Sequence, residues 1–249
     1  MRRYFYWTTV LLILFPTLFS HACAKTMTFS GHDLPPYFFN QNGVARGAFV
    51  DTLEIICKHL QYQCAFEIKP LLRVEYEIKN GITDGWVVGL DPSRDAFLIQ
   101  PKPWFYMKLS FMGLTASSLK AQNIHDFNNA TVAVVRGSTS MHVLEKIAPP
   151  INFTIIKETS MSTMIKKLHG SRYGTYGVLF GPEQVLVSIG KEQDTPIQVI
   201  FRYFNYSLGV AFSKKAVSAE VANLFNQQLD IMRKNGELQK IEEKWVSSQ

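Results

Sequence analysis

The sequence is poor in cysteine and histidine, and it contains only one long hydrophobic run. Three cysteines and six histidines occur in 249 residues. No low-complexity stretch or acidic tail is present, so extended disorder is not expected. Lys and Arg outnumber Asp and Glu by 26 to 20, but they are scattered. Nucleic-acid binding, which needs a clustered basic face, is therefore not expected. The composition, 47% hydrophobic and 18% charged, suits one large domain or two smaller lobes.

The hydrophobic run lies at the N-terminus. Two arginines precede an apolar stretch over residues 7–19, and the triplet Ala-Cys-Ala follows at 22–24. A basic start, a short apolar core and a small-residue site are typical of a secretory signal peptide. The sequence therefore predicts a signal peptide over residues 1–24, cleaved near Ala24, and an exported protein. Two alternatives stay open: an uncleaved anchor, and a lipoprotein modified at Cys23.

Two cysteines, Cys57 and Cys64, would remain after export, with six residues between them. In an oxidising compartment they are expected to form one local disulfide. Two free thiols are the alternative. A metal site is not expected from this pair.

Two stretches of the chain follow the same plan of strand, helix, glycine stop and apolar strand. Apolar positions at helical spacing predict the helices, and short β-rich runs predict the strands. Two similar α/β units in one chain predict two lobes. The expected elements are a helix over 49–60, a strand over 64–68, a helix over 71–79 and a strand over 86–88 in the first unit, and strands over 132–135, 153–156 and 176–180 with helices over 137–147, 161–168 and from 182 in the second.

Two strand-like segments, residues 108–115 and 206–212, are expected to connect the lobes. The chain then ends in two predicted helices, over 217–234 and 237–245. Two connections between two lobes predict a hinge that closes a cleft around a ligand.

Four motifs in this order resemble one family, the bacterial extracellular solute-binding proteins of family 3, which serve polar amino-acid ABC importers. The motifs are "LPPYFFNQNGVARGAFVDTLEIICKHL", "NGITDGWVVGLDPSR", "VAVVRGSTS" and "LDIMRKNGELQKIEEKW". The resemblance implies a two-lobed α/β periplasmic binding protein of type II, the Venus-flytrap fold, with two crossover strands at the hinge. The lobe boundaries that it implies are 25–112 with 207–249 for lobe 1 and 113–206 for lobe 2.

Arg94 is the main candidate for ligand binding. It follows the apolar strand of "TDGWVVGLDPSRDAF", and the carboxyl ends of parallel strands face the ligand crevice of open α/β sheets. A guanidinium can hold a carboxylate through two parallel hydrogen bonds. The resemblance implies that Arg94 grips the α-carboxylate of the ligand; the alternative is a surface pair with Asp91 or Asp95. The turn before Arg94 is shorter than in the family, and Asp91 stands at a position where a hydroxyl is expected. An acidic side chain there would receive a ligand ammonium.

Further ligand-binding candidates come from both lobes. Backbone N–H groups and hydroxyls at a helix start favour an anion, although the same residues also serve as ordinary helix caps. Aromatic side chains would form a wall for apolar or cationic parts of the ligand, although each also suits a packed core. These candidates are Ser138 and Thr139 at the helix start, and Tyr37, Trp86, Tyr106 and Phe180 among the aromatic residues.

Lobe 2 lacks one residue that amino-acid binders of this family usually carry. The strand "YGVLF" is followed by Gly181-Pro182-Glu183, where the family has an aspartate for the ligand ammonium. The ligand is therefore expected to be an amino acid held by Asp91 or Glu183, another small carboxylate, or a peptide fragment.

The resemblance implies a monomeric periplasmic protein that binds a small-molecule ligand and delivers it to a membrane ABC permease, without cofactor or catalysis. Two other functions stay open. One is an exported enzyme resembling cyclohexadienyl dehydratase, with Asp91 and Glu183 as its acid–base pair. The other is a ligand sensor that docks on a membrane receptor.

Overall fold

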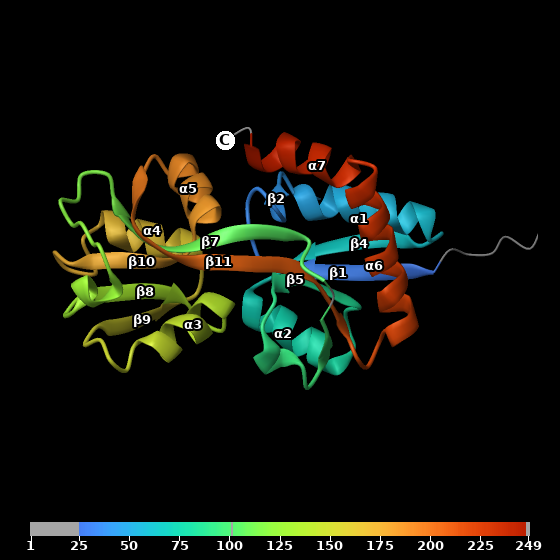
Figure 1. Cartoon of the computed structure of the whole chain (residues 1–249), viewed down its shortest axis with the longest axis horizontal. Helices are drawn as coiled ribbons and strands as arrows, with labels where there is room; N and C mark the ends of the chain where they lie inside the picture. Colours follow the sequence, from blue (N-terminus) through green and yellow to red (C-terminus); the bar gives the residue numbers. More distant parts are fainter. Residues whose placement is uncertain (1–24, 101, 248–249) are drawn as a thin grey trace, which may run out of the picture.

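The computed structural model describes residues 25–100 and 102–247 as two α/β lobes that lie end to end (Figure 1). The predicted signal peptide, residues 1–24, lies outside the described residues. The two-lobed α/β architecture predicted from the sequence is confirmed, whereas the lobe boundaries at residues 112 and 207 stay a prediction.

A single sheet of nine strands runs through both lobes. Its strand order is β4-β1-β5-β11-β7-β10-β8-β9, and β6 pairs with β11 at the side. The strands are β1 (Thr26–Gly31), β4 (Gln63–Ile68), β5 (Gly85–Gly89), β6 (Leu98–Ile99), β7 (Phe105–Leu114), β8 (Thr131–Val135), β9 (Thr154–Glu158), β10 (Gly177–Pro182) and β11 (Ile197–Ser213). A separate hairpin joins β2 (Phe39–Gln41) to β3 (Val44–Arg46) through a turn at Asn42 and Gly43.

Lobe 1 surrounds the parallel strands β4, β1 and β5 with four helices. Side chains of a strand alternate between the two faces of its sheet, and β5 is buried on both. Trp86 and Val88 pack with α2, whereas Val87 packs into the larger core with Phe29. Figure 1 shows α2 on the opposite side of the sheet from α1 and α7. The helices are α1 (Ala48–His59), α2 (Leu71–Asn80), α6 (Ala219–Lys234) and α7 (Glu237–Glu242), which the π-helical segment Glu243–Ser247 follows.

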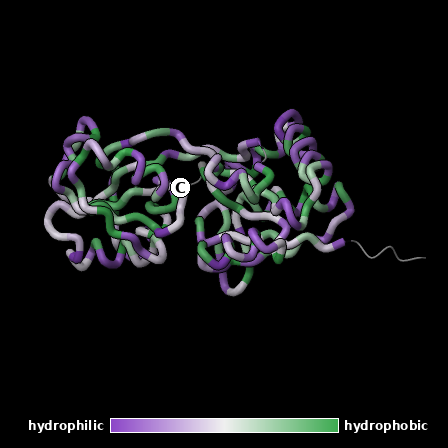
Figure 2. Tube along the Cα trace, turned by 90° about the horizontal axis from the view of Figure 1, so that it is seen from below, coloured by the Kyte–Doolittle hydropathy of each residue, from purple (hydrophilic) through white to green (hydrophobic). Residues whose placement is uncertain are grey.

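Lobe 2 is built on the parallel strands β10, β8 and β9. Its centre is a stack of aromatic rings, in which Phe111 of β7 lies 4.1 Å from Phe127 and 4.6 Å from Phe180, measured between ring centroids. The helices are α3 (Thr139–Ile147), α4 (Met161–His169), α5 (Glu183–Glu192) and the short 3-10 helix η2 (Ile124–Phe127). Figure 2 shows hydrophobic segments inside each lobe and hydrophilic ones on its outside.

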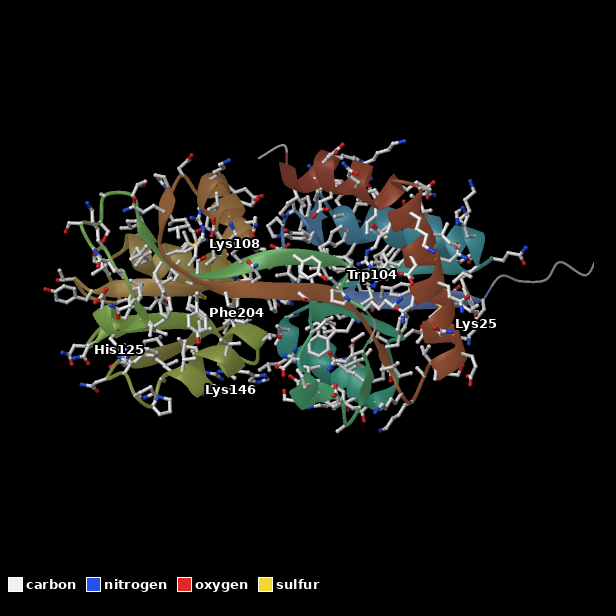
Figure 3. All side chains as sticks on the ribbon, viewed as in Figure 1. Lys25, Trp104, Lys108, His125, Lys146 and Phe204 are labelled. Carbon is white, nitrogen blue, oxygen red and sulfur yellow. A yellow bond between two sulfur atoms is a disulfide. The ribbon has the colours of Figure 1, made fainter. Side chains whose placement is uncertain are left out.

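The lobes are connected by β7 and β11, which pair as antiparallel neighbours from Phe105↔Leu208 to Leu114↔Ile197. The sequence predicted both crossings, but β11 begins at Ile197, well before the expected residue 206. Two register shifts interrupt the pairing, after Val199 and after Arg202. Figure 3 shows Lys108 and Phe204 on this pair of strands, and Figure 2 shows the connection along one side of the molecule.

The predicted disulfide is present between Cys57 and Cys64. It connects the end of α1 to the start of β4, where the two Cα atoms lie 6.1 Å apart. It therefore fixes the helix that covers one face of lobe 1 against the edge strand of the sheet.

In the part of the chain that the structure describes, no helix has both the length and the apolar character for crossing a membrane.

Candidate functional site

A cavity of about 400 Å³ lies between the two lobes. The carboxyl ends of the parallel strands β1, β4, β8 and β9 all meet at this gap, as expected for ligand crevices of α/β sheets. The side chains that line the cavity therefore come from the last residues of these strands, from the loops that follow them, and from the helices α2, α4 and α5. We call this space the cleft cavity; its lining residues are His32, Asp33, Ile68, Lys69, Pro70 and Leu71 from lobe 1, and Val135, Thr159, Ser160, Met161, Ser162 and Ile189 from lobe 2.

Arg94 lies at the end of β5, in the 3-10 helix η1 (Pro92–Arg94), and is only 2% exposed. Its guanidinium reaches across to lobe 2. Nη2 donates to the carbonyl of Gly137 at 2.9 Å, and Nη1 donates to Thr139 Oγ1 at 2.9 Å. The guanidinium carbon also lies 4.7 Å from the centroid of the Trp86 ring. The structure thus brings together three of the predicted ligand-binding residues, Arg94, Trp86 and Thr139. The Arg94 guanidinium contacts the side chains of the other two.

A second contact between the lobes involves Asp91. His142 Nδ1 on α3 lies 2.7 Å from Asp91 Oδ2, and the Ser93 backbone N–H donates to Asp91 Oδ1. Burial opposes the ionisation of Asp91, but hydrogen bonds from His142 and Ser93 and the charge of Arg94 hold the pKa of this carboxyl below its usual range. We call Asp91, Arg94, Thr139 and His142 the inter-lobe cluster.

Tyr206 of β11 completes the surroundings of this cluster. Thr139 Oγ1 donates to the carbonyl of Gly89, and its hydroxyl is also hydrogen-bonded to Tyr206. Burial raises the pKa of Tyr206 to about 12, so the phenol is neutral near pH 7. Gly89 lies directly against the Tyr206 ring and leaves no space for a side chain of its own. The inter-lobe cluster is therefore packed on its hinge side as well as across the gap.

The other candidates from the sequence are distributed over the two cores and the surface. Ser138 accepts a hydrogen bond from the Met141 N–H and donates one to the carbonyl of Val135, so its hydroxyl caps α3. Tyr37 is fully buried against Phe105, and Phe180 is buried in the aromatic stack of lobe 2. Tyr106 is 61% exposed on β7. Ligand contact by these residues stays a prediction.

Glu183, the expected substitute for the missing aspartate, is the first residue of α5 and accepts hydrogen bonds from Arg202 Nε and Nη2 at 2.9 Å each. Ser110 Oγ donates to the same carboxylate at 3.0 Å. Although burial opposes its ionisation, these donors hold the pKa of Glu183 below its usual range. Both candidate carboxylates, Asp91 and Glu183, are thus already engaged by side chains of the protein.

His32 is a residue that sequence reasoning did not single out. It follows β1, lines the cleft cavity, and its Nδ1 is shielded from solvent without a hydrogen-bond partner in the described part of the chain. Burial and the nearby charge of Arg94 lower the pKa of His32 to about 4. The imidazole is therefore neutral near pH 7 and offers the cavity a neutral hydrogen-bonding group.

The lowered pKa of His32 predicts a loss of stability in mild acid. Between pH 6.5, the ordinary value, and about 4, the unfolded chain binds a proton that the folded protein resists. The contribution of neutral His32 is complete above pH 6.5 and falls as the pH drops toward 4. We expect His32→Asn to remove about 3 kcal/mol of this pH dependence in urea unfolding measured between pH 7 and pH 4. His125→Asn, at an exposed histidine, is the control; an equal change in both variants would contradict the prediction.

Comparisons with known proteins agree with this architecture. Residues 27–248 match the bacterial extracellular solute-binding proteins, family 3. The arginine-binding periplasmic protein of Mannheimia haemolytica is 24% identical, with 96% of this chain and 98% of that protein covered. The structure of an ancestral arginine-binding protein bound to arginine has a TM-score of 0.78 at 21% identity, covering 89% of this chain and 98% of that one. A histidine kinase sensor domain with similarity to periplasmic binding proteins reaches 0.78 at 20% identity, covering 90% and 96%.

The fold and the cleft between the lobes define a two-lobed binding protein. Because the family match spans nearly all the described residues, the chain belongs to the bacterial extracellular solute-binding proteins of family 3. The family resemblance inferred from the four sequence motifs is confirmed.

Proposed function

We propose that this protein binds a small polar solute, an amino acid or a related small molecule, between its lobes and delivers it to an ABC-type membrane importer. The observation that carries the proposal is the cleft cavity, whose lining comes from both lobes. A ligand that contacts both lobes stabilises the closed arrangement over an open one, and this shift in population is the basis of capture. The volume of about 400 Å³ suits a molecule of metabolite size.

Export supports the proposal. The basic start, the apolar stretch over residues 7–19 and the small residues at 22–24 have the pattern of a signal peptide, and the Cys57–Cys64 disulfide suits an oxidising compartment. We place the mature protein in the periplasm, where it would meet the permease. Catalysis is not part of the proposal, because Asp91 and Glu183 are each paired with a basic side chain of the protein.

Thermal unfolding in the presence of amino acids, small carboxylates and amines tests capture. A ligand at about 100 times its Kd adds about 2.7 kcal/mol to the stability of the folded state, so at least one of these solutes should raise the Tm by several degrees. If no solute in such a panel raises the Tm, capture in the cleft is contradicted.

Two threonine variants localise the effect. Thr159 is exposed and lines the cleft cavity, so Thr159→Trp should fill the cavity and abolish the ligand-induced rise in Tm. Thr154 is exposed at the other end of β9, and Thr154→Trp should leave the rise unchanged. An unchanged rise in Thr159→Trp would contradict binding in this cavity.

A further inference from the structure

Asp91 and His142 form a titratable pair that connects the two lobes. Asp91 immediately precedes η1 in lobe 1, and His142 lies in α3 of lobe 2. The atoms Asp91 Oδ2 and His142 Nδ1 are 2.7 Å apart. Because the partners belong to different lobes, this contact forms only when the lobes are close together. We call Asp91 and His142 the acid–imidazole pair.

The acid–imidazole pair lies on the hinge side of the gap between the lobes. Together with residues 204–207 of β11, it lines a depression of about 290 Å³. The lining that the described residues give the cleft cavity includes neither member of the pair. The His142 side chain is 31% exposed, whereas that of Asp91 is 5% exposed. Solvent protons therefore reach the imidazole without passing through the cleft cavity.

Asp91 is the member of the pair whose charge stays constant in mild acid. Burial opposes its ionisation, but hydrogen bonds from His142 and Ser93 and the charge of Arg94 hold the pKa of the Asp91 carboxyl below its usual range. A buried carboxylate is costly unless it has a partner. Opening of the lobes would remove His142, so the solvation of Asp91 favours the closed arrangement only as far as His142 compensates its charge.

His142 is the member whose charge can vary, since histidine is the side chain that commonly changes charge between pH 5 and pH 8. The charged and titratable groups among the described residues around it are Asp91 and Arg94 at η1, Lys146 on α3 and Tyr206 on β11. Lys146 is exposed, so solvent screens its charge. Burial raises the pKa of Tyr206 to about 12, so this phenol is neutral.

The contact with Asp91 decides which charge state of His142 the closed arrangement favours. The Arg94 guanidinium is also positive, but it donates to the Gly137 carbonyl and the Thr139 hydroxyl, whereas the Asp91 carboxylate touches the imidazole ring directly. A protonated imidazole donates a charge-assisted hydrogen bond to a carboxylate, which is stronger than the bond from a neutral imidazole. The closed arrangement therefore binds this proton more tightly than an open one.

We propose that the acid–imidazole pair is a pH-sensitive contact that favours the closed arrangement of the lobes in mild acid and weakens it above neutral pH. The proposal rests on the proposed function in one respect, the opening and closing of the lobes. Since closure and protonation of His142 favour each other, a fall in pH from 8 to 6 shifts the population toward the closed form. A solute held between the lobes would then be released more readily at the higher pH.

Fluorescence energy transfer between dyes on the two lobes tests the proposal without any ligand. Tyr76→Cys on α2 and Thr154→Cys on β9 supply exposed labelling sites, one on each lobe. The ratio of closed to open protein should be at least about threefold larger at pH 6 than at pH 8. His142→Asn keeps a neutral N–H donor beside Asp91 but cannot become charged, so its ratio should be the same at both pH values.

His169→Asn is the matched control, because His169 is an exposed histidine at the end of α4 in the same lobe. This variant should keep the pH dependence of the parent protein. Other groups in the gap, His32, Asp33 and Glu192, also respond to acid, but they are the same in parent and variant, so the comparison cancels them. Retention of the pH dependence in His142→Asn would overturn the proposal, as would a parent protein that is open at both pH values.

A double-mutant cycle in urea unfolding keeps the test decisive for a protein that is closed at both pH values. The cycle combines Asp91→Ala with His142→Ala and isolates the coupling between the two side chains. Expressed as a factor in the unfolding equilibrium constant, this coupling should be at least about threefold larger at pH 6 than at pH 8. Equal coupling at the two pH values would contradict a pH-sensitive contact.

Failure of this proposal and failure of the proposed function give different results. A solute that raises the Tm, together with closure that does not depend on pH, overturns the role of the acid–imidazole pair and leaves capture standing. Closure that depends on pH through His142, without any solute that raises the Tm, supports the pair and contradicts capture.

Discussion

Replacing Phe111 by alanine should lower the free energy of unfolding by about 4 kcal/mol. The ring is fully buried on β7 and stacks on Phe127 at 4.1 Å and against Phe180 at 4.6 Å, so its removal leaves a cavity at the centre of lobe 2. Phe111 also pairs with Phe201 of β11, at the side of the lobe that enters the hinge. The loss should therefore also loosen the connection between the lobes.

Urea unfolding followed by circular dichroism measures this effect. Phe204→Ala is the matched control, because Phe204 lies on β11, is 38% exposed and is labelled in Figure 3. Its removal should cost less than about 1 kcal/mol. A similar cost for the two variants would mean that the aromatic stack of lobe 2 does not hold the lobe together.

Replacing Gly89 by alanine should cost about 3 kcal/mol through overpacking at the inter-lobe cluster. A Cβ atom at residue 89 would overlap the hydroxyl and ring atoms of Tyr206. Tyr206 is buried and hydrogen-bonded to Thr139, so moving its ring aside breaks this contact. Displacing it should also disturb the contacts of Arg94 with lobe 2.

Gly113→Ala on β7 is the control for a glycine in the same sheet. A Cβ atom there would meet the Ile200 side chain at its terminal Cδ1, 2.7 Å away, and this flexible end can rotate aside. We expect a cost below about 1 kcal/mol for this variant. If Gly89→Ala unfolds at the same urea concentration as the parent protein, Tyr206 does not pack against residue 89 as described.

Much of the fold could be predicted from the sequence because its local patterns are strong. The helix predicted over 71–79 is α2 (Leu71–Asn80), and the apolar strand predicted over 86–88 is β5 (Gly85–Gly89). The glycine stop at Gly81 is a left-handed helix end, as its sequence context indicates. The start of β11 was missed because Val199 to Phe204 pair through two register shifts, which break the simple alternation of buried and exposed residues.

The candidate site was harder to predict because its partners lie far apart in the sequence. The pattern placed Arg94 at the end of a buried strand, where the structure has it. It could not show that the guanidinium meets Gly137 and Thr139, more than 40 residues later, because tertiary contacts determine the acceptor. The sequence predicts that Asp91 receives a ligand ammonium, and this stays a prediction; in the structure its Oδ2 lies 2.7 Å from His142 Nδ1. The signal for His142 was its position one helical turn after Thr139, on the same face of α3.

The connection through β7 and β11 has a consequence for how the chain acquires its structure. A protein emerges from the ribosome with its N-terminus first. The strands and helices of lobe 2 are all present once Tyr206 has been made, but lobe 1 still lacks the last part of β11 and the whole of α6. Phe29 of β1, which packs against Phe212 and Phe225, stays uncovered until those late residues appear. The lobe that begins the chain is therefore completed last.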